Sequence, residues 1–116
     1  MALVLILLNV PIAITANVDD YIGSFHKISS TQADFTAALA NNDYFGYSIS
    51  AMGDHNADSL TDLIAIGAAY SDHGGSGRGA MYIISINPNG IIQSFQTISN
   101  LYGDFTALLS DSDYFG

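Results

Sequence analysis

Apolar and polar residues alternate with the period of a β-strand in the middle of the chain. Over residues 47–52, an apolar side chain occupies every second position between small polar ones. Residues 63–68 are apolar, and two of the six are β-branched. Successive side chains of a strand point to opposite faces, so both segments are predicted to be strands. The mostly polar residues 54–62 then form the loop that joins them.

This loop carries four oxygen-bearing side chains at regular spacing: Asp54, Asn56, Asp58 and Asp62. Three carboxylates and an amide that turn toward one point repel each other unless a cation lies there, and ligands made only of oxygen suit calcium. By analogy with known calcium loops, Leu60 would add its backbone carbonyl. The alternative interpretation is a polar surface turn without a metal, because Asp and Asn favour turns by themselves.

Two other kinds of calcium motif do not fit these residues. An EF-hand needs an entering helix and an acidic residue at position 12 of its loop, where this chain has Ala65. The glycine-rich calcium repeat of β-rolls requires an Asp after its glycines, but residues 74–78 are followed by Gly79. The sequence therefore predicts a calcium hairpin of the strand–loop–strand kind.

The chain also contains an internal repeat with an offset of 70 residues. Between residues 24–46 and 94–116, 13 of 23 positions are identical without a gap. The longest matches join 34–37 to 104–107 and 43–46 to 113–116. A fixed period with many short strands predicts stacked supersecondary units that bury their cores against one another.

Together these motifs resemble the FG-GAP repeats of the integrin α-subunit type of β-propeller. In that pattern a Phe-Gly pair precedes a strand, a Gly-Asp pair opens a calcium loop, and Asp-Leu begins an apolar strand ending in Gly-Ala. A glycine-rich loop and a Gly-Ala-x-Tyr strand follow. The matching residues here are Phe45-Gly46, Gly53-Asp54, Asp62-Leu63, Gly67-Ala68 and Gly79-Ala80-Met81-Tyr82. The resemblance covers one full repeat, about residues 45–113, and the second half of the preceding one.

Two residues depart from the family pattern. Ser59 stands where the family usually has Gly, and Ala69 stands where it often has Pro. Glycine adopts positive φ without steric strain. If the loop keeps that angle at position 59, Ser59 lowers the stability of the loop conformation by roughly 1 kcal/mol. Ser59→Gly is then expected to tighten calcium binding.

The resemblance implies an all-β fold of antiparallel four-stranded propeller blades, about one and a half of them. Residues 1–44 would be the second half of one blade plus a connection, 45–113 a complete blade with its calcium loop, and 114–116 the opening of the next. The strands of the complete blade are expected over 47–52, 63–68, 80–86 and 91–98. Residues 87–90 form the last hairpin turn, because Asn-Gly readily adopts positive φ. A helical turn with Asp104 as its N-cap is expected in the connection 99–115.

The apolar residues 2–16 have two interpretations. A signal peptide would need a positively charged start, and no Lys or Arg precedes Lys27. The segment is also too short for a membrane span, and Asn9 and Pro11 interrupt it. In the repeat, residues 3–8 align with 81–86, so we expect the third strand of the previous blade there. Residues 12–28 would contain the fourth.

Composition agrees with a β-rich chain built around loops. All 11 acidic residues are Asp, and Asp favours turns and calcium loops whereas Glu favours helices. A net charge of −9 argues against nucleic acid or anionic membranes as partners. The lack of cysteine excludes a disulfide framework. Because calcium is abundant outside cells, we expect an extracellular or cell-surface location.

The sequence contains no recognisable catalytic motif. His26, His55 and His73 lie far apart, and His55 occupies a non-ligand position of the loop that is expected to face solvent. The glycines of residues 74–79 are not followed by Lys-Ser or Lys-Thr, so a flexible strand connection is expected instead of a phosphate loop. We therefore expect a protein that is not an enzyme.

The resemblance implies a calcium-stabilised module for recognition or adhesion, with a protein or glycan ligand bound by propeller loops. The alternatives are an accessory propeller attached to a secreted or surface hydrolase, and a purely structural repeat. Propellers have four to eight blades, so this length is typical of a fragment of a longer repeat protein. The isolated chain is then expected to associate with itself.

Overall fold

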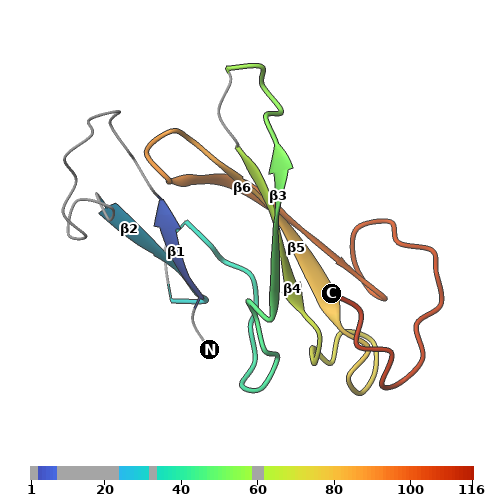
Figure 1. Ribbon diagram of the computed structural model, residues 1–116. Helices are drawn as coiled ribbons and strands as arrows, with labels where there is room; N and C mark the ends of the chain where they lie inside the picture. The colour runs from blue at the N-terminus through green and yellow to red at the C-terminus, as the bar shows by residue number, and fades with distance from the viewer. Residues whose placement is uncertain (1–2, 8–23, 32–33, 59–61) are drawn as a thin grey trace.

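The computed structural model describes residues 3–7, 24–31, 34–58 and 62–116, and six β-strands lie in them (Figure 1). An antiparallel pair is formed by β1 (Leu3–Leu7) and β2 (Ser24–Ile28). A four-stranded antiparallel sheet follows in chain order: β3 (Ser48–Gly53), β4 (Leu63–Ala68), β5 (Ala80–Ile86) and β6 (Ile92–Ser99). None of the described residues is helical. The prediction of an all-β chain with a four-stranded antiparallel sheet is confirmed.

The strand boundaries in this sheet follow the sequence pattern closely. β4 and β5 have the predicted bounds, while β3 and β6 begin and end one residue later than predicted. The turn between β5 and β6 contains Gly90 with a φ of 78°, and Asn87 closes it by accepting N–H groups from Asn89 and Ile91. Asn-Gly therefore sets this hairpin as expected.

Strand β1 lies where the repeat predicts a third strand. Its residues pair with β2 in the order Leu3 with Ile28 through Leu7 with Ser24. The fourth strand predicted within 12–28 is present as β2. The rest of that segment, and residues 8 and 2, lie outside the described residues.

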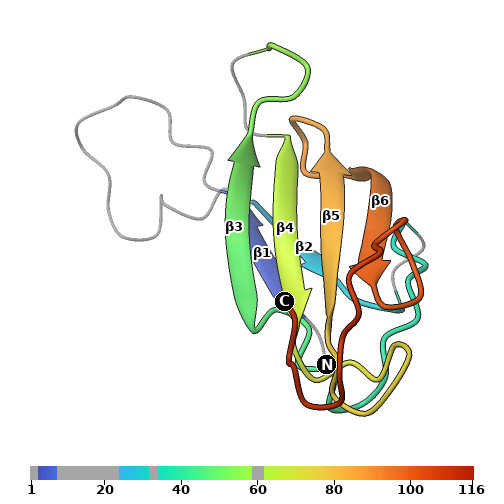
Figure 2. The same ribbon diagram turned by 90° about the vertical axis from the view of Figure 1, so that its right-hand side faces the viewer.

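The core lies on one face of the four-stranded sheet. Figure 2 shows the β1–β2 pair behind this sheet, and in Figure 1 the chain from residue 34 to β3 passes between the two. The last residue of β2, the connection and the sheet all supply side chains to one cluster. Its members are Ile28, Phe35, Ala37, Phe45, Ile64, Ile66, Ala68, Ala80, Tyr82, Ile84, Ile86 and Ile92. The alternate residues of β4 and β5 face the core, as the period of a strand requires.

The helical turn predicted at Asp104 is wrong. Asp104 has a φ of 52°, in the left-handed region, and the residues after it form bends and turns. Two backbone N–H groups that a helix would use are taken by side chains instead. Leu109 donates to Asn100 Oδ1 at 3.1 Å, and Ser110 donates to Asp113 Oδ2 at 2.7 Å. Local side-chain acceptors therefore compete successfully with the helix.

Tyr82 is the largest side chain of the core and is fully buried. Burial first, and the nearby Asp43 carboxylate second, raise the pKa of Tyr82 to about 12 from its ordinary value of 10.0. Between these two values the unfolded chain loses this proton and the folded chain keeps it. Raising the pH from 10 to 12 should therefore destabilise the fold by about 1.4 kcal/mol per pH unit through Tyr82 alone.

A tyrosinate absorbance titration tests this expectation. The native chain should show a late phase near pH 12, and Tyr82→Phe should remove that phase while the other tyrosines titrate as before. A Tyr82→Phe titration identical to that of the native chain would show that Tyr82 does not ionise late.

Candidate functional site: an oxygen-rich loop

The predicted calcium loop joins β3 to β4 and projects beyond the end of the sheet (Figure 1). Its base is closed by the Asp62 N–H, which donates to the Gly53 carbonyl at 3.2 Å. Asp62 is 6% exposed, whereas Asp54, Asn56 and Asp58 are exposed. Leu60 and Ser59 lie outside the described residues. The loop thus has one buried carboxylate at its base and its other described oxygen ligands on the solvent side.

Side-chain oxygens of the loop accept hydrogen bonds from backbone N–H groups of the same loop. The Ala57 and Asp58 N–H groups both donate to Asp54 Oδ1, at 2.5 and 3.2 Å. The Asp58 N–H is also 2.9 Å from Asn56 Oδ1. Across the base, the His55 N–H donates to Asp62 Oδ1 at 2.7 Å. These contacts turn the chain back on itself, as a loop that surrounds a cation must do.

The donor chemistry of the loop fits a hard cation. Asp54, Asp58 and Asp62 contribute three carboxylates to the loop. Carboxylate and amide oxygens are the ligands that calcium prefers. Within the described ranges, no group of three or more His, Asp or Glu side chains is gathered closely enough to hold a metal ion. Binding would therefore require the loop to close, with Asn56 and the Leu60 carbonyl completing the ligands.

In the described part of the loop, a residue other than glycine, Ala57, has a strained backbone φ angle. Ala57 has a φ of 65°, which costs a residue with a Cβ about 1 kcal/mol. Ala57→Gly removes this cost in the folded loop and should stabilise the fold by up to about 1 kcal/mol. Urea unfolding of the native chain and the variant measures the change. Equal or lower stability of Ala57→Gly would contradict the left-handed angle at Ala57.

The repeated residues have a structural role that the repeat alone does not predict. We call residues 34–46 the first clasp and residues 104–116 the second clasp. In the first, the Ala40 N–H donates to Asp43 Oδ2 at 2.8 Å, and in the second, Ser110 donates to Asp113 in the same way. Tyr44 and Tyr114 both have positive φ, 55° and 53°. The sequence feature that could have indicated this shared structure is the Asp-Tyr-Phe-Gly segment, which is identical at residues 43–46 and 113–116.

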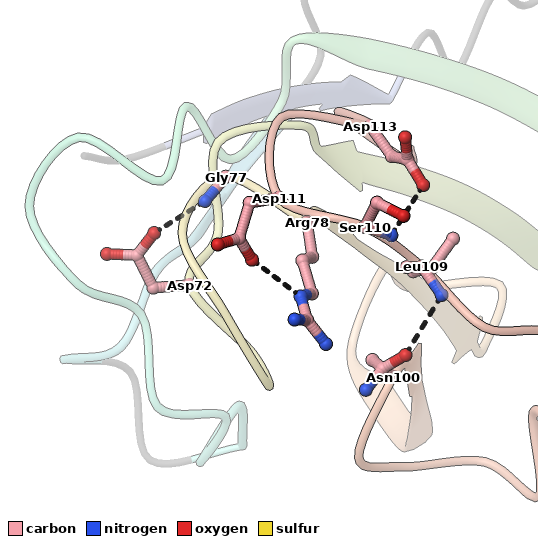
Figure 3. A network of polar contacts seen from close by, with 8 residues as sticks. All are labelled: Asp72, Gly77, Arg78, Asn100, Leu109, Ser110, Asp111 and Asp113. Atoms are coloured by element: carbon pink, nitrogen blue, oxygen red, sulfur yellow. Dashed lines mark hydrogen bonds and ion pairs between the residues drawn. The ribbon is translucent and has the colours of Figure 1, made fainter.

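The second clasp is tied to the glycine-rich connection between β4 and β5. Figure 3 shows Arg78 Nε donating to Asp111 Oδ1 at 2.8 Å and the Gly77 N–H donating to Asp72 Oδ1. Gly79 and Phe115 form a parallel bridge. A Cβ at Gly79, whose φ is 87°, would lie within 2.0 Å of the Phe115 carbonyl oxygen. The glycines of this connection therefore permit close packing of the second clasp.

Aromatic residues divide into two groups. Phe35, Phe45 and Tyr82 pack in the core. Four tyrosines at one end of the sheet are exposed and contact each other instead. The Tyr70 ring lies between two repeat-related rings, each tilted by 43° to it with a centroid distance of 4.7 Å, and a fourth ring borders them. The group is Tyr44, Tyr47, Tyr70 and Tyr114.

Comparison with known proteins found no matching family model, no matching curated protein and no matching solved structure. Among the residues that the structure describes, no helix is long and apolar enough to cross a membrane.

Proposed function

We propose that this chain is a calcium-binding segment of an FG-GAP type β-propeller, in a secreted or cell-surface protein that serves recognition or adhesion and is not an enzyme. The observation that carries the proposal is the oxygen-rich loop between two neighbouring strands of a four-stranded antiparallel sheet. The position of this loop matches the one that the FG-GAP pattern assigns to its calcium loop.

The internal repeat supports a stacked architecture. The two clasps are identical at 9 of 13 positions, and each has a hydrogen bond to an Asp side chain and a pair of packed rings: Phe35 with Phe45 at 5.4 Å, and Phe105 with Phe115 at 4.9 Å. The first pair is fully buried beneath the sheet, and the second pair is half-buried. On this account residues 45–113 are one blade, the first clasp connects the preceding blade to it, and the second clasp leads to the next.

The exposed tyrosines supply a surface for recognition. Tyrosine combines an apolar ring with a hydroxyl that forms hydrogen bonds, and it is common in protein interfaces. The group lies at the end of the sheet opposite the calcium loop, since the loop precedes β4 and Tyr70 follows it. A protein or glycan ligand contacting propeller loops would meet this group.

Asp62→Asn tests the role of Asp62 as a calcium ligand. Asparagine keeps an oxygen that accepts the His55 N–H, so the base of the loop should stay closed while the charge is lost. We expect calcium affinity to fall by at least about tenfold, because affinity depends on the number of charged ligands. Calorimetric titration of both chains gives the ratio. Asp72→Asn, outside the loop, is the matched control and should bind as the native chain does. Equal affinity of Asp62→Asn and the native chain would contradict the proposal.

A further inference from the structure

A cavity of about 260 Å³ lies at the end of the sheet away from the calcium loop. Residues 38–40 and Asp43 of the first clasp form one wall, and residues 71–73, after β4, form the other. Most of its lining is apolar, and its polar groups come from Asp43 and from the 71–73 segment. A cavity of this size holds a ligand of a few heavy atoms.

Two residues that line the cavity each carry a buried polar atom without a hydrogen-bond partner. Ser71 is 1% exposed and its Oγ has no partner, and neither has His73 Nδ1. Buried polar atoms are nearly always paired, because each unpaired one costs free energy. These atoms indicate that something polar binds here.

Asp43 determines which polar group fits. It is 4% exposed, and its Oδ2 accepts the Ala40 N–H, which leaves Oδ1 for a ligand. A buried carboxylate is normally paired with a cation. The ion pair found in the described ranges joins Arg78 to Asp111, so Asp43 has no cationic partner there. Neighbouring Asp72 adds a second carboxylate to the lining.

We propose that this cavity binds an alkylammonium group. Its positive charge pairs with the Asp43 carboxylate, whose Oδ1 accepts one of its N–H groups, and the unpartnered Ser71 Oγ and His73 Nδ1 belong to residues of the facing wall. The short carbon chain lies against the apolar residues 38–40. The site is independent of the calcium proposal, since it uses none of the loop residues 54–62. Its ligand is either a free amine or a lysine side chain.

Saturation-transfer NMR with the full chain tests the charge requirement, and it works in any association state. Propylammonium should bind, and propan-1-ol, of equal length and neutral, should bind about tenfold more weakly or not at all, as expected for a lost charge-assisted hydrogen bond. Nα-acetyl-lysine methylamide separates the two sources: its binding assigns a lysine side chain, and binding of propylammonium alone assigns a free amine. No transfer to propylammonium, or equal transfer to the alcohol, overturns the proposal.

The internal repeat supplies a matched pair of variants. Asp43→Asn retains an acceptor for the Ala40 N–H but removes the charge, and should weaken propylammonium binding about tenfold or more. Asp113→Asn makes the same change in the second clasp, where the carboxylate is exposed, and should leave binding unchanged. Ser71→Ala should weaken binding less than Asp43→Asn does, and it keeps the test valid if Asp43→Asn misfolds. Native affinity in a folded Asp43→Asn or in Ser71→Ala overturns the proposal.

Discussion

Phe35→Ala is expected to unfold most of the chain. Phe35 is fully buried and its ring packs against three others: Phe45 at 5.4 Å, Tyr82 at 5.9 Å and Phe95 at 4.9 Å. Removing a buried Phe side chain leaves a cavity and costs about 3–5 kcal/mol, a large part of the stability of a small domain. Urea unfolding followed by circular dichroism measures the loss.

The internal repeat provides the control for this prediction. Phe105 is the repeat-related residue of the second clasp, and it is only half-buried, with one ring contact, to Phe115. Phe105→Ala should therefore cost much less, about 1 kcal/mol. Equal losses for the two variants would show that the first clasp is not part of the core.

The isolated chain is expected to associate in solution. The face of the sheet opposite the core carries half-buried apolar residues that do not belong to the core cluster: Leu63, Ala65, Met81, Ile83 and Ile98. In a stack of repeats, a neighbouring sheet would cover this face. The edge strands β3 and β6 also present unpaired backbone groups, which invite association. Sedimentation velocity should show oligomers that dissociate only at low concentration.

Ile83→Lys tests whether this face is the contact. Ile83 lies in the middle of β5 and pairs with Ala65 and Gln96 on the same face. A buried lysine there is costly, so the oligomers should dissociate about tenfold more readily or more. Asn89→Lys, in the exposed hairpin turn, makes the same change of charge and should have little effect. A native chain that sediments as a clean monomer and melts cooperatively would contradict the stacked interpretation.

Local patterns were sufficient to predict the four-stranded sheet. β4 is short and apolar between polar segments, and Asn89-Gly90 provides a turn with its own conformational preference. Each signal acts within a few residues, so it can be read without knowing the rest of the fold. The same holds for the spacing of Asp54, Asn56 and Asp58 along one loop.

Contacts between distant segments could not be predicted in this way. The pattern of residues 34–46 does not say which sheet face buries Phe35, or that Asp43 lies beside Ser71 at a cavity. The expected helix at Asp104 failed because Asn100 and Asp113 accept backbone N–H groups from this segment. The pairing of Asn100 with Leu109, nine residues apart, depends on the path of the connection between them. Residue type alone does not show that Tyr82 is buried whereas Tyr44, Tyr70 and Tyr114 are exposed.

Calcium occupancy tests the central proposal most directly. Equilibrium dialysis against calcium counts bound ions whatever the association state of the chain. The native chain should bind one calcium in its loop, and Asp58→Ala should lose that ion, because the loop then lacks one of its three carboxylates. Asp34→Ala, an exposed carboxylate of the first clasp, should retain it. Unchanged calcium uptake by Asp58→Ala would contradict the calcium-binding loop.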